Sequence, residues 1–212
     1  MTSVDLKEKV LRLWKLFLPF NGVVVVSLHL PLLGYLMYFH PLKRILGNLY
    51  STRAALSYYG VYNDTAMLFN ATMVIMGILL FPYCLRVAEI VKIKSFPKKF
   101  MYISSSISFI VIGMVTADYP HDYMCVQKVI HWGAALYLIV GFSLSMVITK
   151  EFRKTCSLAP VIGVVGFLGN IVIFFVTDYN KMFIELWFYF YMSVWVIIST
   201  INMAKDGMLL KK

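Results

Sequence analysis

Charged residues are scarce in this sequence. Asp, Glu, Lys and Arg make up 14% of its 212 residues, whereas hydrophobic residues make up 60%. Water-soluble globular domains carry about 25% charged residues, so the composition excludes a soluble globule. No polar stretch is long enough to form a second domain, and we expect a single membrane domain over residues 1–212.

Cysteine is also rare, with three residues and no Cys-x-x-Cys spacing. The topology predicted below puts Cys84 and Cys156 near the cytoplasmic side and Cys125 near the opposite side. A structural disulfide needs two cysteines in an oxidising compartment, so we expect three free thiols. No Ser or Cys lies in the Gly-x-Ser-x-Gly context of a hydrolase nucleophile, and nucleophilic catalysis has little support in the sequence.

Long apolar runs are what the sequence has in abundance. About 20 helical residues cross the hydrocarbon core of a bilayer, and six runs of this length are bounded by charge. They predict an all-α, multi-pass bundle of six transmembrane helices at 16–39, 66–85, 100–117, 129–149, 158–177 and 183–203. The first run follows a charged stretch and is too long for a signal peptide, so we expect an uncleaved anchor.

The net charge of +10 follows this topology. Fifteen Lys and Arg residues fall on one predicted side and five on the other. The fifteen are Lys7, Lys9, Arg12, Lys15, Arg86, Lys92, Lys94, Lys98, Lys99, Lys150, Arg153, Lys154, Lys205, Lys211 and Lys212, and the five are Lys43, Arg44, Arg53, Lys128 and Lys181. Short loops rich in Lys and Arg stay in the cytoplasm. We therefore expect a protein of the cytoplasmic (cell) membrane with both termini inside, and no nucleic-acid partner.

Small residues recur at spacings of three and four in the fifth run. They are Ala159, Gly163, Gly166 and Gly169. Such a stripe lets a neighbouring helix backbone approach closely. The pattern predicts tight helix packing in this span.

Hydrogen-bonding side chains on five different runs are expected in the outer half of the bundle. They are His29, Asn70, His131, Asn170 and Glu185. At 1.5 Å of rise per residue, His29 and His131 both lie about 20 Å from the cytoplasmic boundary. Polar residues inside a bilayer are costly and commonly form a pair, a pathway or a site. We predict a shared polar pocket; the alternative is one interhelical hydrogen bond each, worth about 0.6 to 2 kcal/mol.

Some of these polar residues could also be ligands of a metal ion or a haem. Asp118, His121 and His131 supply the three ligands that a catalytic zinc needs, but their spacing matches no metal motif, and a helix-capping turn is the commoner use of residues 118–122. His29 and His131 are level, as the axial ligands of one haem are. We predict no cofactor.

Short landmarks occur in order along most of the chain. They are Leu56-Ser57-Tyr58-Tyr59-Gly60, then Leu68-Phe69-Asn70 with Gly77, Gly113 with Asp118-Tyr119-Pro120, His131 with Gly133-Ala134-Ala135, and Glu185 with Trp195. With these landmarks the sequence resembles a prokaryotic six-span membrane protein family of unknown function. It is also similar to the DRAM-like (damage-regulated autophagy modulator) superfamily, which includes proteins of GPI-anchor lipid remodelling.

The resemblance implies a six-helix fold with a loop-capped outer face. It draws attention to Ser57, Gly60, Asn70, His131 and Glu185, and the outer-loop candidates are Ser57, Gly60, Asp118, His121 and Asp122. Tyr58 stands where the relatives tend to carry Asp, so a role for that acid does not transfer to this chain.

Three functions remain open at this stage, and the sequence does not decide whether the protein is an enzyme. The first is handling of a lipid headgroup or small amphiphile in the outer pocket, with a bound lipid as partner. The second is a scaffold or accessory subunit that meets a membrane protein or a second copy through the aromatic residues 187–195. The third is a small-solute or proton pathway with His29 and His131 as relay groups.

Overall fold

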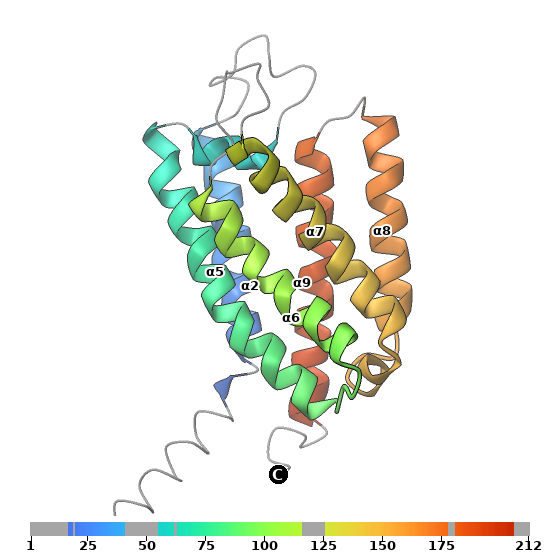
Figure 1. Ribbon diagram of the computed structural model, residues 1–212. Coiled ribbons are helices and arrows are strands. Elements are labelled where there is room, and N and C mark those ends of the chain that lie inside the picture. The colour runs from blue at the N-terminus through green and yellow to red at the C-terminus, as the bar shows by residue number, and fades with distance from the viewer. Residues whose placement is uncertain are drawn as a thin grey trace, which may run out of the picture.

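The computed structural model describes residues 17–18, 20–40, 55–61, 63–115, 126–177 and 181–205, and the regular elements in these ranges are all helices. It contains six α-helices and two short 3-10 helices there (Figure 1). The α-helices are α2 (Phe20–Phe39), α5 (Asn63–Ile90), α6 (Phe96–Met114), α7 (Val126–Ile148), α8 (Ala159–Val176) and α9 (Lys181–Lys205). The 3-10 helices are η2 (Leu56–Gly60) and η3 (Lys150–Lys154).

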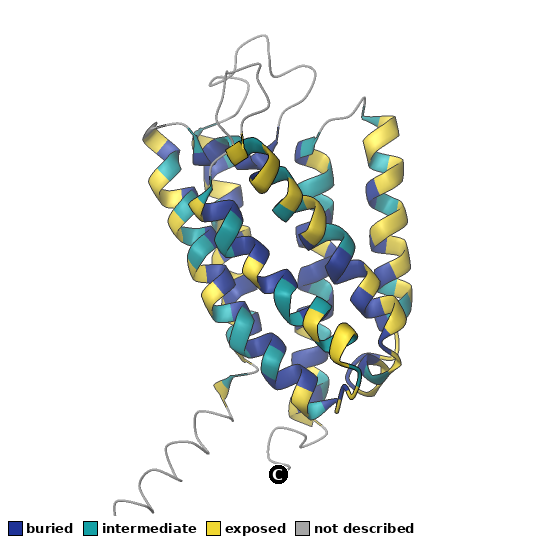
Figure 2. Ribbon diagram, viewed as in Figure 1, coloured by how far each residue is buried: buried dark blue, intermediate teal, exposed yellow. Residues whose placement is uncertain are grey.

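The helices follow one another around a bundle. Each of α5, α6, α7 and α8 packs against the next helix in sequence, and α2 contacts both α5 and α9, which closes the ring. Half of the apolar window of α9 is buried inside the protein, against 22% of the window of α8. Thus α9 supplies much of the interior, whereas α8 exposes most of its surface (Figure 2).

The predicted all-helical class and the long apolar helices are confirmed. Five helices, α2, α5, α7, α8 and α9, are long and apolar enough to cross a membrane. The exception among the described helices is α6, which carries two lysines in its first turn and four serines further on. Ser104, Ser105 and Ser106 donate to carbonyls of their own helix three or four residues earlier, which satisfies their hydroxyl groups locally.

Helix α5 continues five residues past the end predicted for the second span, to Ile90. The predicted span ends before Arg86 because a charged residue is expected at the membrane boundary. Arg86 instead lies largely buried and pairs with Glu89 at 3.2 Å, one turn further along the same helix. A pair at this spacing supports a helix, so the charges extend α5 and do not terminate it.

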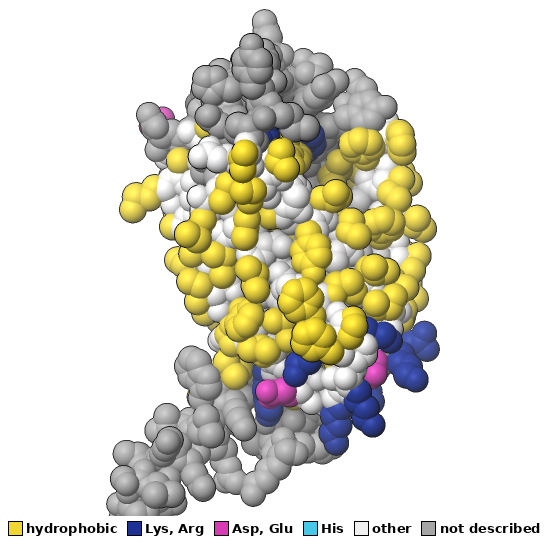
Figure 3. All heavy atoms as spheres, viewed as in Figure 1, with side chains coloured by type: hydrophobic (Ala, Val, Ile, Leu, Met, Phe, Trp, Pro, Cys, Tyr) yellow, Lys and Arg dark blue, Asp and Glu magenta, His cyan; other side chains and the backbone are white. Residues whose placement is uncertain are grey.

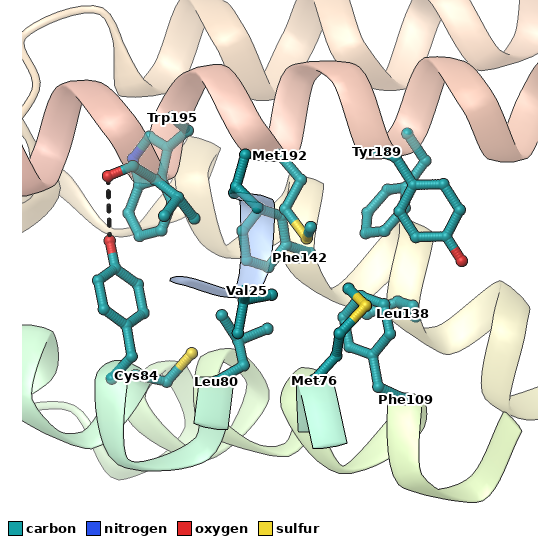
Figure 4. Close-up of a cluster of buried hydrophobic side chains, with 14 of the residues drawn as sticks. Val25, Met76, Leu80, Cys84, Phe109, Leu138, Phe142, Tyr189, Met192 and Trp195 are labelled. Atoms are coloured by element: carbon teal, nitrogen blue, oxygen red, sulfur yellow. Dashed lines mark hydrogen bonds between the residues drawn. The ribbon is translucent and has the colours of Figure 1, made fainter. Parts of the chain in front are cut away.

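An aromatic cluster fills the bundle between α5, α6, α7, α9 and η3. The ring of Trp195 lies 5.6 Å from that of Tyr102, 5.4 Å from that of Phe142 and 5.3 Å from that of Phe152. Tyr83 adds an edge contact to Trp195 and donates to the carbonyl of Val196 at 3.5 Å (Figure 4). We call these five rings the Trp195 cluster. It closes the interior on the side of the bundle that η3 covers.

Close packing along α8 confirms the reading of its small residues. A Cβ on Gly163 would lie 2.8 Å from the carbonyl oxygen of Ser143 on α7, and one on Gly166 would lie 2.7 Å from the ring of Tyr191 on α9. Gly169 stands against the indole of Trp187. Only glycine leaves room for these neighbours, so the stripe sets the distance between α8 and both adjacent helices.

The two ends of the bundle differ in charge. Hydrophobic side chains form a belt around the middle, and Lys and Arg gather below it (Figure 3). This basic end carries Lys92, Lys94, Lys98, Lys99, Lys150, Arg153 and Lys154, from the α5–α6 connection, the start of α6 and η3. Lys98 and Lys154 each donate to a carbonyl of a neighbouring segment, at 2.8 Å to Ile148 and 3.2 Å to Val91. The opposite end carries η2, and we call it the η2 end (Figure 1).

Aromatic residues of α9 mostly point inward, which corrects one expectation. Phe188, Tyr189, Tyr191 and Trp195 are buried in the bundle, and of the candidate surface residues on this helix Phe190 is the exposed one. The expectation that the aromatic run forms a lateral partner surface is therefore wrong for these four. The reason is that α9 is the most enclosed of the five apolar helices, so that most of its faces meet other helices.

Two of the cysteines are buried free thiols, as predicted. They are Cys84 in α5 and Cys156 after η3. Cys125 lies outside the described residues.

Candidate functional site

The 3-10 helix η2 is held at its end of the bundle by three polar side chains. Oε2 of Glu185, on α9, accepts the backbone N–H of Leu56 at 2.6 Å and that of Ser57 at 3.3 Å. Asn70 donates from Nδ2 to the carbonyl of Gly60 at 2.9 Å. Thr65 donates to the carbonyl of Tyr59 at 2.7 Å. The first N–H groups and last carbonyls of a helix have no partner within it, and here two other elements supply those partners.

The close contact between η2 and α5 requires a glycine at position 60. A Cβ on this residue would collide with Oδ1 of Asn70 and would lie 3.1 Å from the ring of Phe69. The turn therefore approaches α5 closely enough for Asn70 to bond its backbone, and a side chain at this position would prevent the approach. Gly60 and Asn70, two of the predicted site residues, act together to seat η2 on α5.

His131 lies beside η2, in the first two turns of α7. Its ring is buried, and Nδ1 is 2.6 Å from the carbonyl oxygen of Val115, which follows the end of α6. A carbonyl oxygen only accepts, so Nδ1 carries the proton and Nε2 keeps its lone pair. Nε2 is buried and has no partner in the described part of the chain. One ring nitrogen thus fixes the orientation, and the other remains available.

Ser57, His131 and Glu185 line one small cavity. Its other walls are aromatic or aliphatic: Phe69, Ile112, Ala135, Leu138, Ile139, Phe188 and Tyr189. The cavity has a volume of about 20 Å³, which is room for one or two waters. Ser57 is buried, and its hydroxyl, like Nε2 of His131, has no partner among the described residues. Two polar groups without a partner among the described residues therefore meet one partly open, mainly apolar space.

The positively charged side chain of Lys181 lies at the start of α9, one turn before Glu185. The ammonium group of Lys181 is 3.4 Å from the ring centroid of Trp132, which is adjacent to His131 in α7. A cation over an aromatic face is attracted by the ring electrons, by about 0.5 to 2 kcal/mol. This contact ties the beginning of α9 to α7 beside the cavity.

One family model matches the chain, described as "Protein of unknown function (DUF998)", over residues 45–202. The match spans three quarters of the chain, from before η2 to near the end of α9. The chain belongs to the DUF998 family. No curated protein and no solved structure matches it significantly. All three polar residues of the cavity lie inside the DUF998 match.

His29, on α2, lies outside the DUF998 match and does not line the cavity. Its ring is buried and packs on that of Tyr189, with centroids 4.1 Å apart. Neither ring nitrogen has a partner within the described ranges. Tyr189 itself lines the cavity, so His29 stands behind one wall of it.

Asn170 belongs to a different network. It donates from Nδ2 to the hydroxyl of Tyr191 at 3.3 Å, and that hydroxyl is 2.7 Å from the hydroxyl of Ser143. These contacts join α7, α8 and α9 through a single interhelical chain. Of the five predicted pocket residues, the structure brings His131 and Glu185 to the cavity and Asn70 to the turn above it. It places His29 behind Tyr189 and Asn170 elsewhere.

Asp118, His121 and Asp122 lie outside the described residues. Within the residues that are described, no three His, Cys, Asp or Glu side chains are grouped as metal ligands are. The expectation that Asp118, His121 and His131 hold no zinc is untested, because the first two residues lie outside the described ranges.

The sequence analysis does not include Tyr189 among the candidate site residues, because it places this residue in an aromatic run on the surface. The spacing along α9 nevertheless points to it. Tyr189 follows Glu185 by four residues, which puts both side chains on one face of a helix. Ser57 was found through the resemblance alone, since no pattern in its surroundings indicated that a turn would bury it.

Proposed function

We propose that this DUF998 protein is a six-span protein of the cell membrane with both termini in the cytoplasm. Its cavity at the η2 end binds a polar group of a lipid or small amphiphile. The observation that carries the proposal is the pair of buried, unpartnered polar atoms, Ser57 Oγ and His131 Nε2, in one cavity with apolar walls.

Support for the sixth span comes from the position of α6. Its 19 residues extend about 28 Å at 1.5 Å per residue, close to the thickness of a hydrocarbon core. It packs between α5 and α7, both of which are apolar enough to cross. Lys98 and Lys99 lie in its first turn at the basic end, where long cationic side chains reach the interface.

Support for the orientation comes from the charge difference between the ends. The basic end carries the seven described Lys and Arg residues named above, whereas Lys128 and Lys181 begin α7 and α9 near the η2 end. Positively charged connections remain on the cytoplasmic side. The cavity then belongs to the outer half of the bilayer.

The chemistry of the cavity suits an amphiphile. Ser57 donates or accepts through its hydroxyl and His131 accepts at Nε2, so a hydroxyl or amine group, which can donate to Nε2 and also pair with Ser57, satisfies both. The enclosed volume admits one such group and not a whole headgroup. The rest of the molecule then lies against the apolar walls and in the surrounding bilayer. An unsatisfied buried polar group costs about 1 to 3 kcal/mol, which favours occupancy.

A pathway through the bundle is less well supported. Beyond the cavity, towards the basic end, the interior is occupied by the Trp195 cluster, whose rings pack edge to face and are mostly fully buried. The similarity to DRAM-like proteins of lipid remodelling is in line with a lipid ligand, and it remains a prediction from the sequence.

The test is lipid analysis of the purified protein. Mass spectrometry of extracts from the wild type should find one lipid class enriched over the membrane average. His131→Leu fills the cavity with apolar atoms and should lose the enrichment. Asn170→Ala removes an equally buried polar group away from the cavity and should keep it. Equal lipid profiles in all three proteins contradict the proposal.

A further inference from the structure

Ser57 is presented by a turn that is fixed from both ends. Glu185 bonds its backbone N–H and that of Leu56, and Asn70 bonds the carbonyl of Gly60 three residues later. The hydroxyl of Ser57 takes part in none of these bonds and is buried against the cavity. A serine whose backbone is locked while its hydroxyl is left unpaired is unusual, because buried hydroxyls are normally satisfied.

His131 offers a matching base. Its Nδ1–H is fixed by the carbonyl of Val115 at 2.6 Å, which sets the tautomer and leaves the Nε2 lone pair for the cavity. In serine hydrolases an acceptor at Nδ1 performs the same task for the histidine that activates the nucleophile. The acceptor here is a backbone carbonyl in place of a carboxylate, so it orients the ring without adding a charge.

Tyr189 supplies a hydroxyl donor in the same cavity. Among the described residues its hydroxyl bonds the sulfur of Met73, at 3.8 Å, and a thioether is a weak acceptor. Figure 4 shows this hydroxyl turned away from Trp195. A stronger acceptor that enters the cavity, such as a negatively charged oxygen, can take over this hydrogen bond.

We propose, on the basis of the lipid site argued above, that the cavity is the active site of an acyl-ester hydrolase or acyltransferase that acts on membrane lipids. Ser57 is the nucleophile, His131 is the general base and acid, and Tyr189 stabilises the oxyanion. Glu185 is a positioning residue, because it acts through the backbone of Ser57.

The reaction runs in two steps. Ser57 Oγ bonds to the carbonyl carbon of a lipid ester while its proton moves to Nε2 of His131 through one water of the cavity, because the two atoms form no hydrogen bond with each other in the structure. The carbonyl oxygen, now negative, accepts from Tyr189. The bond to the alcohol oxygen then breaks, and that oxygen takes the proton from Nε2. In the second step a water, or the hydroxyl of a second lipid, loses its proton to Nε2 and attacks the acyl-serine. The Oγ–carbon bond breaks, Ser57 regains the proton, and a fatty acid or a new ester leaves.

The first experiment uses a fluorophosphonate probe on the purified full chain in lipid nanodiscs. An activated serine displaces fluoride and forms an Oγ–phosphorus bond. Peptide mass spectrometry should find the label on Ser57 in the wild type and in Ser106→Ala, which alters a buried serine whose hydroxyl bonds its own helix. His131→Gln should slow labelling about 10²-fold or more, the usual contribution of a general base.

Lipid co-purification measured on the same samples separates the two proposals. Label on Ser57 together with a retained lipid supports both. A retained lipid without label overturns the hydrolase and leaves the binding function standing. Neither lipid nor label overturns both. Ser57→Ala should elute and melt as the wild type does, because its hydroxyl has no hydrogen-bond partner to lose in the described part of the chain. A missing label in that variant therefore does not reflect unfolding.

The second experiment measures turnover. Vesicles of phosphatidylglycerol and phosphatidylethanolamine with a fluorescent acyl chain should release fluorescent fatty acid or exchange it between the two lipids. Ser57→Ala should abolish the release, and Tyr189→Phe should lower it about 10²-fold, as loss of an oxyanion donor does. Glu185→Ala should lower kcat, and Glu185→Gln, which keeps an acceptor oxygen, should restore most of it. Release that is equal in wild type and Ser57→Ala overturns the assignment.

Discussion

The carboxylate of Glu185 holds the backbone N–H of Leu56 at 2.6 Å, although the two residues are 129 positions apart in the chain. This bond joins the turn before the second predicted span to the last helix of the bundle. It also accounts for a partly buried acid in a protein with few charges, because the carboxylate accepts from two backbone donors.

Glu185→Ala should destabilise the protein by about 1 to 3 kcal/mol, since two buried N–H groups lose their acceptor. Thermal unfolding in detergent, followed by circular dichroism, measures the change. Glu89→Ala is the matched control, because its ion pair with Arg86 is half exposed on the acid's side and such pairs are worth about 0 to 1 kcal/mol. Equal melting temperatures for the two variants would show that Glu185 does not anchor η2.

Gly60→Ala should destabilise the fold because its new methyl group collides with Asn70. Overpacking of this kind costs about 1 to 3 kcal/mol. A double-mutant cycle with Asn70→Ala tests the cause: removal of the amide takes away the colliding atom, so the alanine at position 60 should cost less in that background. Strictly additive effects would mean that the two residues do not meet.

Gly163→Ala should destabilise the bundle by about 1 to 3 kcal/mol, because the added Cβ lies 2.8 Å from a backbone oxygen of α7 that cannot turn aside. Gly133→Ala, on α7, meets nothing within 4 Å and should stabilise slightly, since alanine favours a helix by about 1 kcal/mol over glycine. Unfolding temperatures of the two variants give the comparison. A loss of stability that is the same for both would contradict the packing role of α8.

Cysteine labelling checks the orientation. In a variant that lacks the three native cysteines, Lys92→Cys at the basic end should resist a membrane-impermeant maleimide in intact cells and react after lysis. Lys128→Cys, near the η2 end, should react in intact cells. The reverse pattern would invert the topology and move the cavity to the inner half of the bilayer.

The helices were predictable because a run of about 20 apolar residues has few other uses. Their ends were less so: the predicted second span ends at residue 85, before Arg86, whereas the ion pair of Arg86 with Glu89 lies within helix α5, which runs on to Ile90. Hydropathy detects where lipid contact stops. A helix ends where its backbone hydrogen bonds end, so a helix can continue past the point where its contact with lipid ends.

For the candidate site, the sequence predicts how deep each side chain lies along its span, but not which neighbouring helix that side chain faces. Counting residues along each span put His29, His131 and Asn170 at a similar level, but the rotation of each helix decides which neighbour a side chain meets. Asn170 meets Tyr191, and His29 meets Tyr189. The turn η2, which brings Ser57 to His131, is stabilised by contacts far apart in sequence, and no local pattern specifies them.

Helix α2 precedes the stretch shared with DUF998 relatives, yet it completes the circle between α5 and α9. Gly22 fits against Tyr83 of one and Val196 of the other, and His29 covers the ring of Tyr189. Without α2, the described helices α5 to α9 would form an open ring in which one face of Tyr189 is uncovered. Under the proposed function, α2 therefore closes the side of the bundle from which an acyl chain would otherwise reach Tyr189.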